Sequence, residues 1–380
     1  MRSLFVVLAW LCCGVAFAQG AEPIWPTQGW QTSIPEEQGM DSATLAGLVA
    51  FGKMRSFDSV LLVRHGRIVL ETYYAPYSGG TPHAINSATK SVMGSLIGIA
   101  LKDGLLDRLD RPLLDFFRDR PIGNVDERKK AITIQHLLDM TSGIDWHEPL
   151  TGRPETFFEM MHSPDWIGFT LDRPMSNAPG ETFNYNTGTS QLLSAIITKL
   201  TGMNARDYAQ ARLFTPLGIS TANWPLDSQG HATGGFGMAM LPRDMAKIGY
   251  LYLRNGAWED KRILSPAWID KVSHATVDMK LPGAPDLRYS NSFWALPNKQ
   301  VYMAVGYHCQ LIMVFHELDI VAVTTARDFC PFGTLADLVS RAVKSETALP
   351  PDTAGADLLA LAIRHAAGEK PAEAGSTNLR

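Results

Sequence analysis

Motifs that mark several large enzyme classes are missing from this sequence. No G-x-S-x-G nucleophile elbow occurs, and neither an H-E-x-x-H motif nor a Cys-x-x-Cys pair is present. Their absence argues against an α/β-hydrolase and against a zinc enzyme. Lys and Arg together number 34 against 38 Asp and Glu, and no basic run forms a phosphate-binding stripe. We therefore expect no nucleic-acid partner.

Cysteine is scarce, with four in 380 residues, and two of them lie in the first eighteen residues. In that segment Arg2 precedes an apolar stretch, residues 4–17, which ends in a small-x-small cleavage site. The stretch is shorter than the roughly 20 residues that a spanning helix needs, so it favours a signal peptide over a membrane anchor. We expect residues 1–18 to be removed and the protein to be exported, periplasmic or secreted, without a stable membrane anchor.

The mature chain then keeps Cys309 and Cys330. An even number of cysteines in an oxidising compartment permits one disulfide, and two buried free thiols are the alternative. Neither residue has the spacing of a metal ligand. We expect no metal and no organic cofactor.

Composition and pattern indicate a globular α/β chain, with 46% hydrophobic and 19% charged residues. Residues 59–74 form two β-rich runs broken by His65-Gly66, which predicts a hairpin. Residues 301–326 are apolar and β-branched, with a turn expected at Glu317-Leu318, and predict three antiparallel strands. A helix over residues 332–343 would pack on this sheet.

The segment between these strands is predominantly helical in pattern. Residues 86–104 show apolar positions at helical spacing, with Asn86 as the expected cap and Gly104 as the expected stop. Helical patterns then continue to about residue 253. We expect an α/β part (19–104 and 255–345), a helical part (105–254), and a C-terminal tail (346–380) that is a helix followed by disorder.

One S-x-x-K motif, Ser87 and Lys90, is the candidate for nucleophilic chemistry. The spacing alone is weak, because a chain of this composition holds roughly one match by chance. At the first turn of a helix, however, both side chains share one face, so the amine can reach the hydroxyl. An apolar surrounding would lower the pKa of Lys90, and the Ser87 N–H would form half of an oxyanion hole. The alternative is a helix-capping serine followed by a solvated lysine.

Several segments, in the same order, resemble the serine β-lactamase and penicillin-binding family. They are SATKS (87–91), ITIQHLLDMTSGIDW (132–146), PGETFNYNTG (179–188), LFTPLGI (213–219) and GGFGMAMLPRDMAKIGYLYLRNGAW (234–258). The likeness is greatest to the class C branch of esterases and nylon-oligomer-hydrolase-like enzymes. It implies an antiparallel sheet flanked by helices, an inserted all-helical domain, and a site between the two.

The resemblance also implies roles for particular residues. Ser87 would be the acylated nucleophile, Lys90 its base partner, and Tyr185 the tyrosine of the second motif, which shuttles protons. The backbone N–H of Tyr307, which follows a strand glycine, would complete the oxyanion hole with that of Ser87.

Two departures from the family pattern restrict the chemistry. The second motif usually ends in Asn, but here Thr187 stands there, and a hydroxyl cannot present the two donors of an amide. The third motif, usually K-T-G or H-x-G, is here Ala304-Val305-Gly306, so the cation that meets a substrate carboxylate is missing. We therefore expect a small-molecule ester or amide substrate, cleaved through an acyl-enzyme.

Other residues are weaker candidates for contact with substrate. His308 is either a compensating base or carboxylate contact, or a strand histidine that points elsewhere. Trp146 and Trp224 either line an apolar pocket or belong to the core. Two other functions stay open: a β-lactamase or D-Ala-D-Ala peptidase, and a non-catalytic homologue that binds cell-wall fragments or a partner.

Overall fold

The computed structural model describes residues 23–149, 154–281, 283–329 and 331–369. The expected signal peptide, Cys330 and the last eleven residues therefore lie outside the described residues. Within these ranges no helix is long and apolar enough to cross a membrane.

The centre of the fold is a nine-stranded sheet in the order β1-β3-β2-β13-β12-β11-β10-β9-β8. The expected hairpin is β2 (Phe57–Arg64) and β3 (Arg67–Tyr73), and the three expected strands are β11 (Val301–Gly306), β12 (Gln310–Phe315) and β13 (Ile320–Ala326). Neighbouring strands pair antiparallel, except that β1 pairs parallel with β3. The other strands of this sheet are β1 (Gln31–Thr32), β8 (Val277–Asp278), β9 (Arg288–Ser290) and β10 (Phe293–Leu296).

The sheet is covered by helices on both faces. Along β2, Leu61 and Val63 belong to one apolar core while Val60 and Leu62 belong to the other, as the two-residue period of a strand requires. One face packs on α1 (Ser42–Met54), α11 (Phe332–Ala342) and α12 (Thr353–Ala366). The other packs on α2 (Thr89–Lys102), α9 (Pro242–Leu253) and α10 (Pro266–Ser273). Burial on both faces explains why the central strands are continuous apolar runs.

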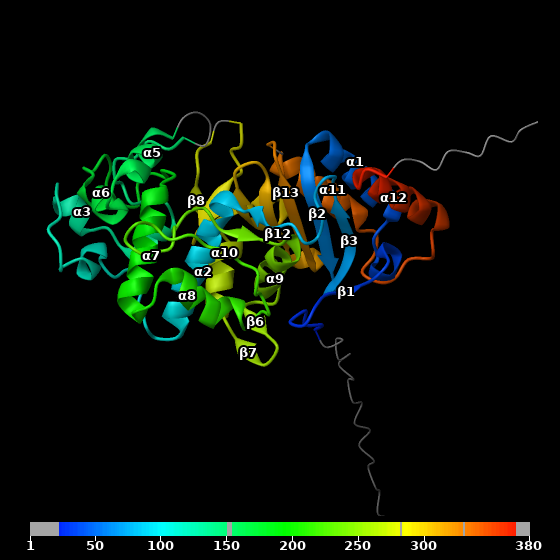
Figure 1. Cartoon of the computed structure of the whole chain (residues 1–380), viewed down its shortest axis with the longest axis horizontal. Coiled ribbons are helices and arrows are strands. Elements are labelled where there is room, and N and C mark those ends of the chain that lie inside the picture. Colours follow the sequence, from blue (N-terminus) through cyan, green and yellow to red (C-terminus); the bar gives the residue numbers. More distant parts are fainter. Residues whose placement is uncertain (1–22, 150–153, 282, 330, 370–380) are drawn as a thin grey trace, which may run out of the picture.

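A second group of helices lies on the side of α2 that is far from α12 (Figure 1). In this group α7 packs against α4, α6 and α8. The same helix also packs against α2. The fold is thus a sheet flanked by helices with a helical insert, as expected. The members of the group are α3 (Glu127–Lys130), α4 (Ile134–Leu138), α5 (Glu155–His162), α6 (Trp166–Asp172), α7 (Thr187–Thr201) and α8 (Ala205–Ala209).

The middle of the chain differs from the expectation in two places. The helix α9 lies in the segment expected to be helical insert, yet it packs on β12 and β13 and so on the sheet. The segment also contributes a strand, β5 (Ala239–Met240), which pairs with β4 (His83–Ala84) just before the S-x-x-K motif. The two small strands connect the insert to the start of α2.

The start of α2 also differs from the expectation. A short 3-10 turn, η2 (Asn86–Ala88), precedes the helix, and Asn86 has a φ of 49°. The Asn86 side chain donates to the Tyr307 carbonyl oxygen at 2.9 Å. The prediction of an Asn86 cap is therefore wrong, because this side chain binds the loop after β11 instead of the helix. Gly104, with a φ of 74°, follows the helix end as expected.

Candidate active site

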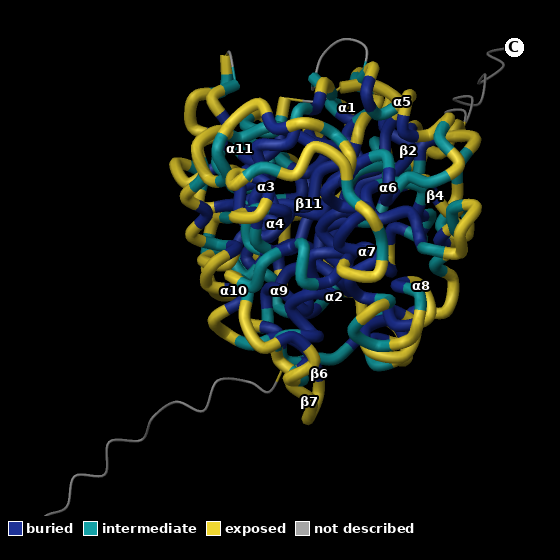
Figure 2. The backbone as a smooth tube through the Cα atoms, turned by 90° about the vertical axis from the view of Figure 1, so that its left-hand side faces the viewer, coloured by how far each residue is buried: buried dark blue, intermediate teal, exposed yellow. Residues whose placement is uncertain are grey.

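Ser87 and Lys90 meet at the junction of η2 and α2. The Lys90 Nζ atom lies 3.2 Å from the Ser87 Oγ atom and is placed to donate a hydrogen bond to it. Lys90 is only 2% exposed, because α2 runs through the interior between the sheet and the helical insert (Figure 2). The alternative of a solvated lysine is excluded.

Two further oxygens surround the Lys90 amine. Its Nζ atom lies 2.9 Å from the Thr187 Oγ1 atom and 2.9 Å from the Gly235 carbonyl oxygen. Thr187 is the first residue of α7, and Gly235 precedes β5, so three segments converge on one nitrogen. Burial lowers the pKa of Lys90 to about 8, and the charge of Glu148 opposes this effect. A neutral amine is therefore accessible at mildly alkaline pH.

Tyr185 lies against the same amine. The Lys90 Nζ atom is 4.7 Å from the centroid of the Tyr185 ring. Burial raises the pKa of Tyr185 well above its usual value, Glu148 raises it further, and hydrogen bonding with Ser87 acts in the opposite direction. Tyr185 thus keeps its proton at neutral pH, and Lys90 is the group that loses one more easily. The three residues named from the motifs lie together.

The end of β11 packs directly on the nucleophile turn. A Cβ atom on Gly306 would collide with the Ile85 carbonyl oxygen, so a glycine is needed at this close approach. Together with the bond from Asn86, this contact holds the Tyr307 backbone beside Ser87. The Tyr307 side chain points outward and is 55% exposed. The His308 ring packs on that of Tyr307 with centroids 3.9 Å apart, and its role in substrate contact stays a prediction.

Ala304 occupies the strand position at which the family usually has a cation. It pairs with Ile312 of β12 and is buried in the core shared with α2. Its side chain is a methyl group and brings no charge to this side of the sheet.

The two tryptophans differ in their surroundings. Trp146 is buried and donates its indole N–H to Glu148 Oε2 at 2.7 Å, which connects it to the site through Glu148. Trp224 is fully buried and donates to the Thr233 carbonyl oxygen at 2.8 Å. Of the two alternatives for Trp224, the structure favours the core, because its side chain is fully buried there.

Cys309 is buried at the end of the turn that leads into β12 and is disulfide-bonded. Because Cys330 lies outside the described residues, the pairing of these two cysteines stays a prediction.

Sequence reasoning missed Glu148. Its two carboxylate oxygens accept from the Thr187 backbone N–H at 2.8 Å and from the Thr187 hydroxyl at 2.6 Å. The residues are 39 positions apart and share no periodic pattern, so only the fold brings them together. The one feature of the sequence that could have pointed to Glu148 is Thr187, which places a hydroxyl where the family usually has the amide of an asparagine.

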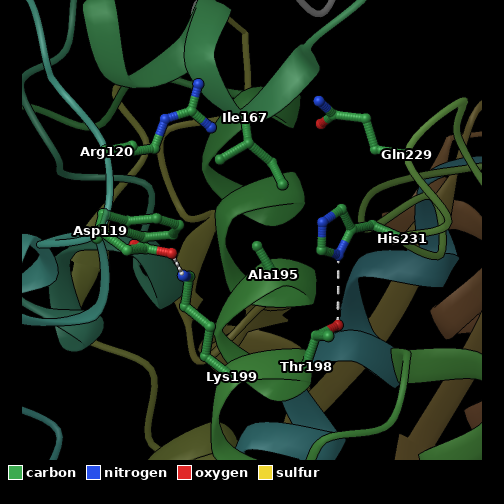
Figure 3. Close-up of a pocket in the computed structure, with 9 residues that line it drawn as sticks. Asp119, Arg120, Ile167, Ala195, Thr198, Lys199, Gln229 and His231 are labelled. Carbon is green, nitrogen blue, oxygen red and sulfur yellow. Dashed lines mark hydrogen bonds and ion pairs between the residues drawn. The ribbon is translucent and has the colours of Figure 1, made fainter.

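A cavity of about 370 Å³ lies elsewhere, beside the second half of α7 (Figure 3). Its charged lining residues are already paired, Lys199 with Asp119 at 2.7 Å and Arg120 with Asp165, and the His231 ring contacts the Thr198 hydroxyl at 3.3 Å. None of its lining residues belongs to the group around Ser87. Across the described ranges, no cluster of three or more His, Cys, Asp or Glu residues could hold a metal ion.

Comparison with known proteins identifies the family. The Beta-lactamase family profile matches residues 36–331, which is most of the chain. The chain therefore belongs to the Beta-lactamase family. The 6-aminohexanoate-dimer hydrolase of Paenarthrobacter ureafaciens is 22% identical over 326 residues, covering 80% of this chain and 79% of that protein.

Solved structures show the same fold. A Bacillus anthracis protein assigned as a 6-aminohexanoate-dimer hydrolase superposes with a TM-score of 0.67 at 18% identity, covering 91% of this chain and 90% of that one. The hydrolase EstCE1, which has promiscuous acyltransferase activity, gives a TM-score of 0.66 at 17% identity, covering 80% of this chain and 99% of its own. The sequence relative and the family together support a hydrolytic enzyme of the class C-like branch.

Proposed function

We propose that the protein is a serine hydrolase that cleaves a neutral carboxylic ester or amide through an acyl-enzyme on Ser87. The observation that carries the proposal is the buried amine of Lys90, 3.2 Å from the Ser87 hydroxyl and with its pKa lowered to about 8. A serine hydroxyl is a weak nucleophile until a base takes its proton, and a desolvated lysine can do so near neutral pH.

Acylation begins with transfer of the Ser87 hydroxyl proton to the neutral Lys90 amine, while the Ser87 oxygen bonds to the substrate carbonyl carbon. The developing oxyanion accepts hydrogen bonds from the backbone N–H groups of Ser87 and Tyr307. The close packing of the β11 end on η2 supports this second donor.

Release of the leaving group needs a proton, and Tyr185 is the candidate donor. Its raised pKa keeps the phenol protonated, and the Lys90 ammonium beside its ring can return the proton afterwards. In the second half-reaction a water gives one proton to this pair and attacks the acyl carbon, and the Ser87 oxygen leaves and is reprotonated. Each group returns to its starting state.

The methyl group of Ala304 supports a neutral substrate. A substrate carboxylate at that position would lose hydration without gaining a fixed positive charge, which is unfavourable. β-Lactams and D-Ala-D-Ala peptides carry such a carboxylate, so the β-lactamase or peptidase alternative is the less favoured one. The name of the Paenarthrobacter relative, 6-aminohexanoate-dimer hydrolase, supports including amides, because two amino acids in a dimer are joined by an amide bond.

A substrate panel tests the proposal. We expect higher kcat/KM for a neutral short-chain ester than for a chromogenic cephalosporin, with a linear amide measured on the same sample. The comparison is made at about pH 6 and about pH 8, because burial lowers the pKa of Lys90 to about 8 and more of its neutral amine is present at the higher pH. Equal efficiency on the cephalosporin and the ester at the higher pH would contradict the argument from Ala304.

Labelling with a serine-reactive phosphonate separates this proposal from the non-catalytic alternative. An active serine hydrolase takes up one phosphonate per chain, and Ser87→Ala abolishes the uptake. A parent protein that stays unlabelled and turns over no member of the panel would favour a binding protein.

A further inference from the structure

The carboxylate of Glu148 is hydrogen-bonded to Thr187, the residue whose hydroxyl also contacts Lys90. Three donors converge on its two oxygens: the Thr187 hydroxyl at 2.6 Å, the Thr187 N–H at 2.8 Å and the Trp146 indole N–H at 2.7 Å. Two oxygens that receive three hydrogen bonds suit an ionised carboxylate, which only accepts. Glu148 belongs to none of the three motifs that define the site.

This carboxylate fixes the direction of the next hydrogen bond. The Thr187 hydroxyl has a single proton, and Glu148 accepts it, so the Thr187 oxygen presents only lone pairs to Lys90. The Lys90 amine, 2.9 Å away, must therefore donate to Thr187.

These hydrogen bonds orient the lone pair of the neutral Lys90 amine. A neutral amine has two N–H bonds, and the Thr187 hydroxyl and the Gly235 carbonyl oxygen take one each. What remains is the lone pair, which is then directed at the third neighbour, the Ser87 hydroxyl at 3.2 Å. This is the orientation in which Lys90 can accept the serine proton.

We propose that Glu148 is a positioning residue that acts through Thr187 to hold Lys90 as the proton acceptor for Ser87. The inference rests on the proposed function. In this chain Thr187 and Glu148 together provide the acceptor for Lys90 that the amide oxygen of an asparagine could provide at the same position. The substitution of Asn by Thr is then compensated rather than disabling.

Glu148 also contributes through its charge. The charged and titratable groups recorded around Lys90 are Glu148 and Tyr185. The negative charge of Glu148 raises the pKa of Lys90 against the lowering by burial, so loss of that charge moves the pKa of Lys90 downward.

The test uses Glu148→Gln in the full chain, with a neutral p-nitrophenyl ester as the probe. This leaving group departs without a proton donor, so the rate reports on Lys90 rather than on Tyr185. We expect a fall in the plateau kcat of about ten-fold to a hundred-fold, because a glutamine amide can donate to Thr187 and let its hydroxyl turn toward Lys90. We also expect the rise of kcat with pH to move to lower pH.

Two matched variants control for effects unrelated to Lys90. Glu148→Asp keeps the charge and is expected to keep the position of the pH profile. Glu181→Gln removes an exposed carboxylate that lies in the same loop as Tyr185, four residues earlier, and is expected to leave both kcat and the profile unchanged. A purely structural role of Glu148 would lower kcat without moving the profile, and this outcome would overturn the proposal.

A double-mutant cycle tests the route through Thr187. Thr187→Val removes the hydroxyl and keeps the backbone N–H, so Glu148→Gln added to it should cost no further kcat. Losses that add would overturn the route. If the parent is active and Glu148→Gln behaves like the parent, the inference fails alone; if the parent neither labels nor turns over ester, the proposed function fails with it.

Discussion

Lys90 shows how the setting of one residue determines its chemistry. With a pKa lowered to about 8, the amine is mostly protonated below that pH and mostly neutral above it. In the proposed mechanism the neutral amine is the active form, so we expect kcat/KM for a neutral ester to rise about ten-fold per pH unit below about pH 8 and to level off above it. The measurement is a pH–rate profile from about pH 6 to about pH 10.

A base other than Lys90 would give a different profile. His308→Ala is the control, because His308 packs on the exposed Tyr307 ring beside the site. We expect this variant to keep the parent profile. A rise with pH that disappears in His308→Ala would contradict the assignment of Lys90.

Some residues of the site could be predicted from the sequence, and others could not. The proximity of Ser87 and Lys90 could be expected from their spacing of three residues, and that of Tyr185 only from the resemblance to the family. Glu148 could not be expected, because its partner Thr187 is 39 positions away and the contact depends on how a loop folds over α7. The burial of Trp224 could not be predicted either, because a sequence does not distinguish a tryptophan that lines a pocket from one in the core.

At the scale of elements, the contact between β11 and η2 would position the proposed second oxyanion donor, the Tyr307 N–H. Gly306→Ala would place a Cβ atom against the Ile85 carbonyl oxygen and push the strand end away from the nucleophile turn. We expect kcat to fall by up to about a hundred-fold, because displacements of about 1 Å at a reacting centre have effects of that size. The measurement is kcat on a neutral ester, with thermal unfolding recorded in parallel.

Gly333→Ala in α11 is the matched control, because a Cβ atom there meets nothing within 4 Å. It should keep the activity of the parent. If Gly306→Ala were as active as Gly333→Ala, the end of β11 would have no part in holding the oxyanion.

The elements that sequence patterns predicted are those with long, continuous apolar runs. The β2–β3 hairpin, the strands β11 to β13 and the helix α2 all meet that description. The strands β9 and β10 were not predicted, because they are short. They are joined through Asn291 and Ser292, both with positive φ. The position of α9 on the sheet could not be predicted either, since helical periodicity does not say which surface the apolar face covers.

At the scale of the whole molecule, the N-terminal segment makes a prediction about location. We propose that the protein is exported and that the chain is cleaved after Ala18, as the pattern of residues 1–18 indicates. Expression of the full chain in a bacterium, followed by cell fractionation and N-terminal sequencing, should give a protein outside the cytoplasm that begins at Gln19. An uncleaved chain in the cytoplasm would contradict the proposal.

The central claim for the molecule is that its two halves, the sheet part with α2 and the helical insert with α7, meet to activate Ser87. Trapping the acyl-enzyme tests this claim most directly. The protein is mixed with a slowly hydrolysed neutral ester, quenched in acid, digested and analysed by peptide mass spectrometry, with Ser87→Ala treated in parallel. The account predicts one acyl group, on Ser87, that is absent from Ser87→Ala. An acyl group on a different residue, or turnover that survives in Ser87→Ala, would contradict it.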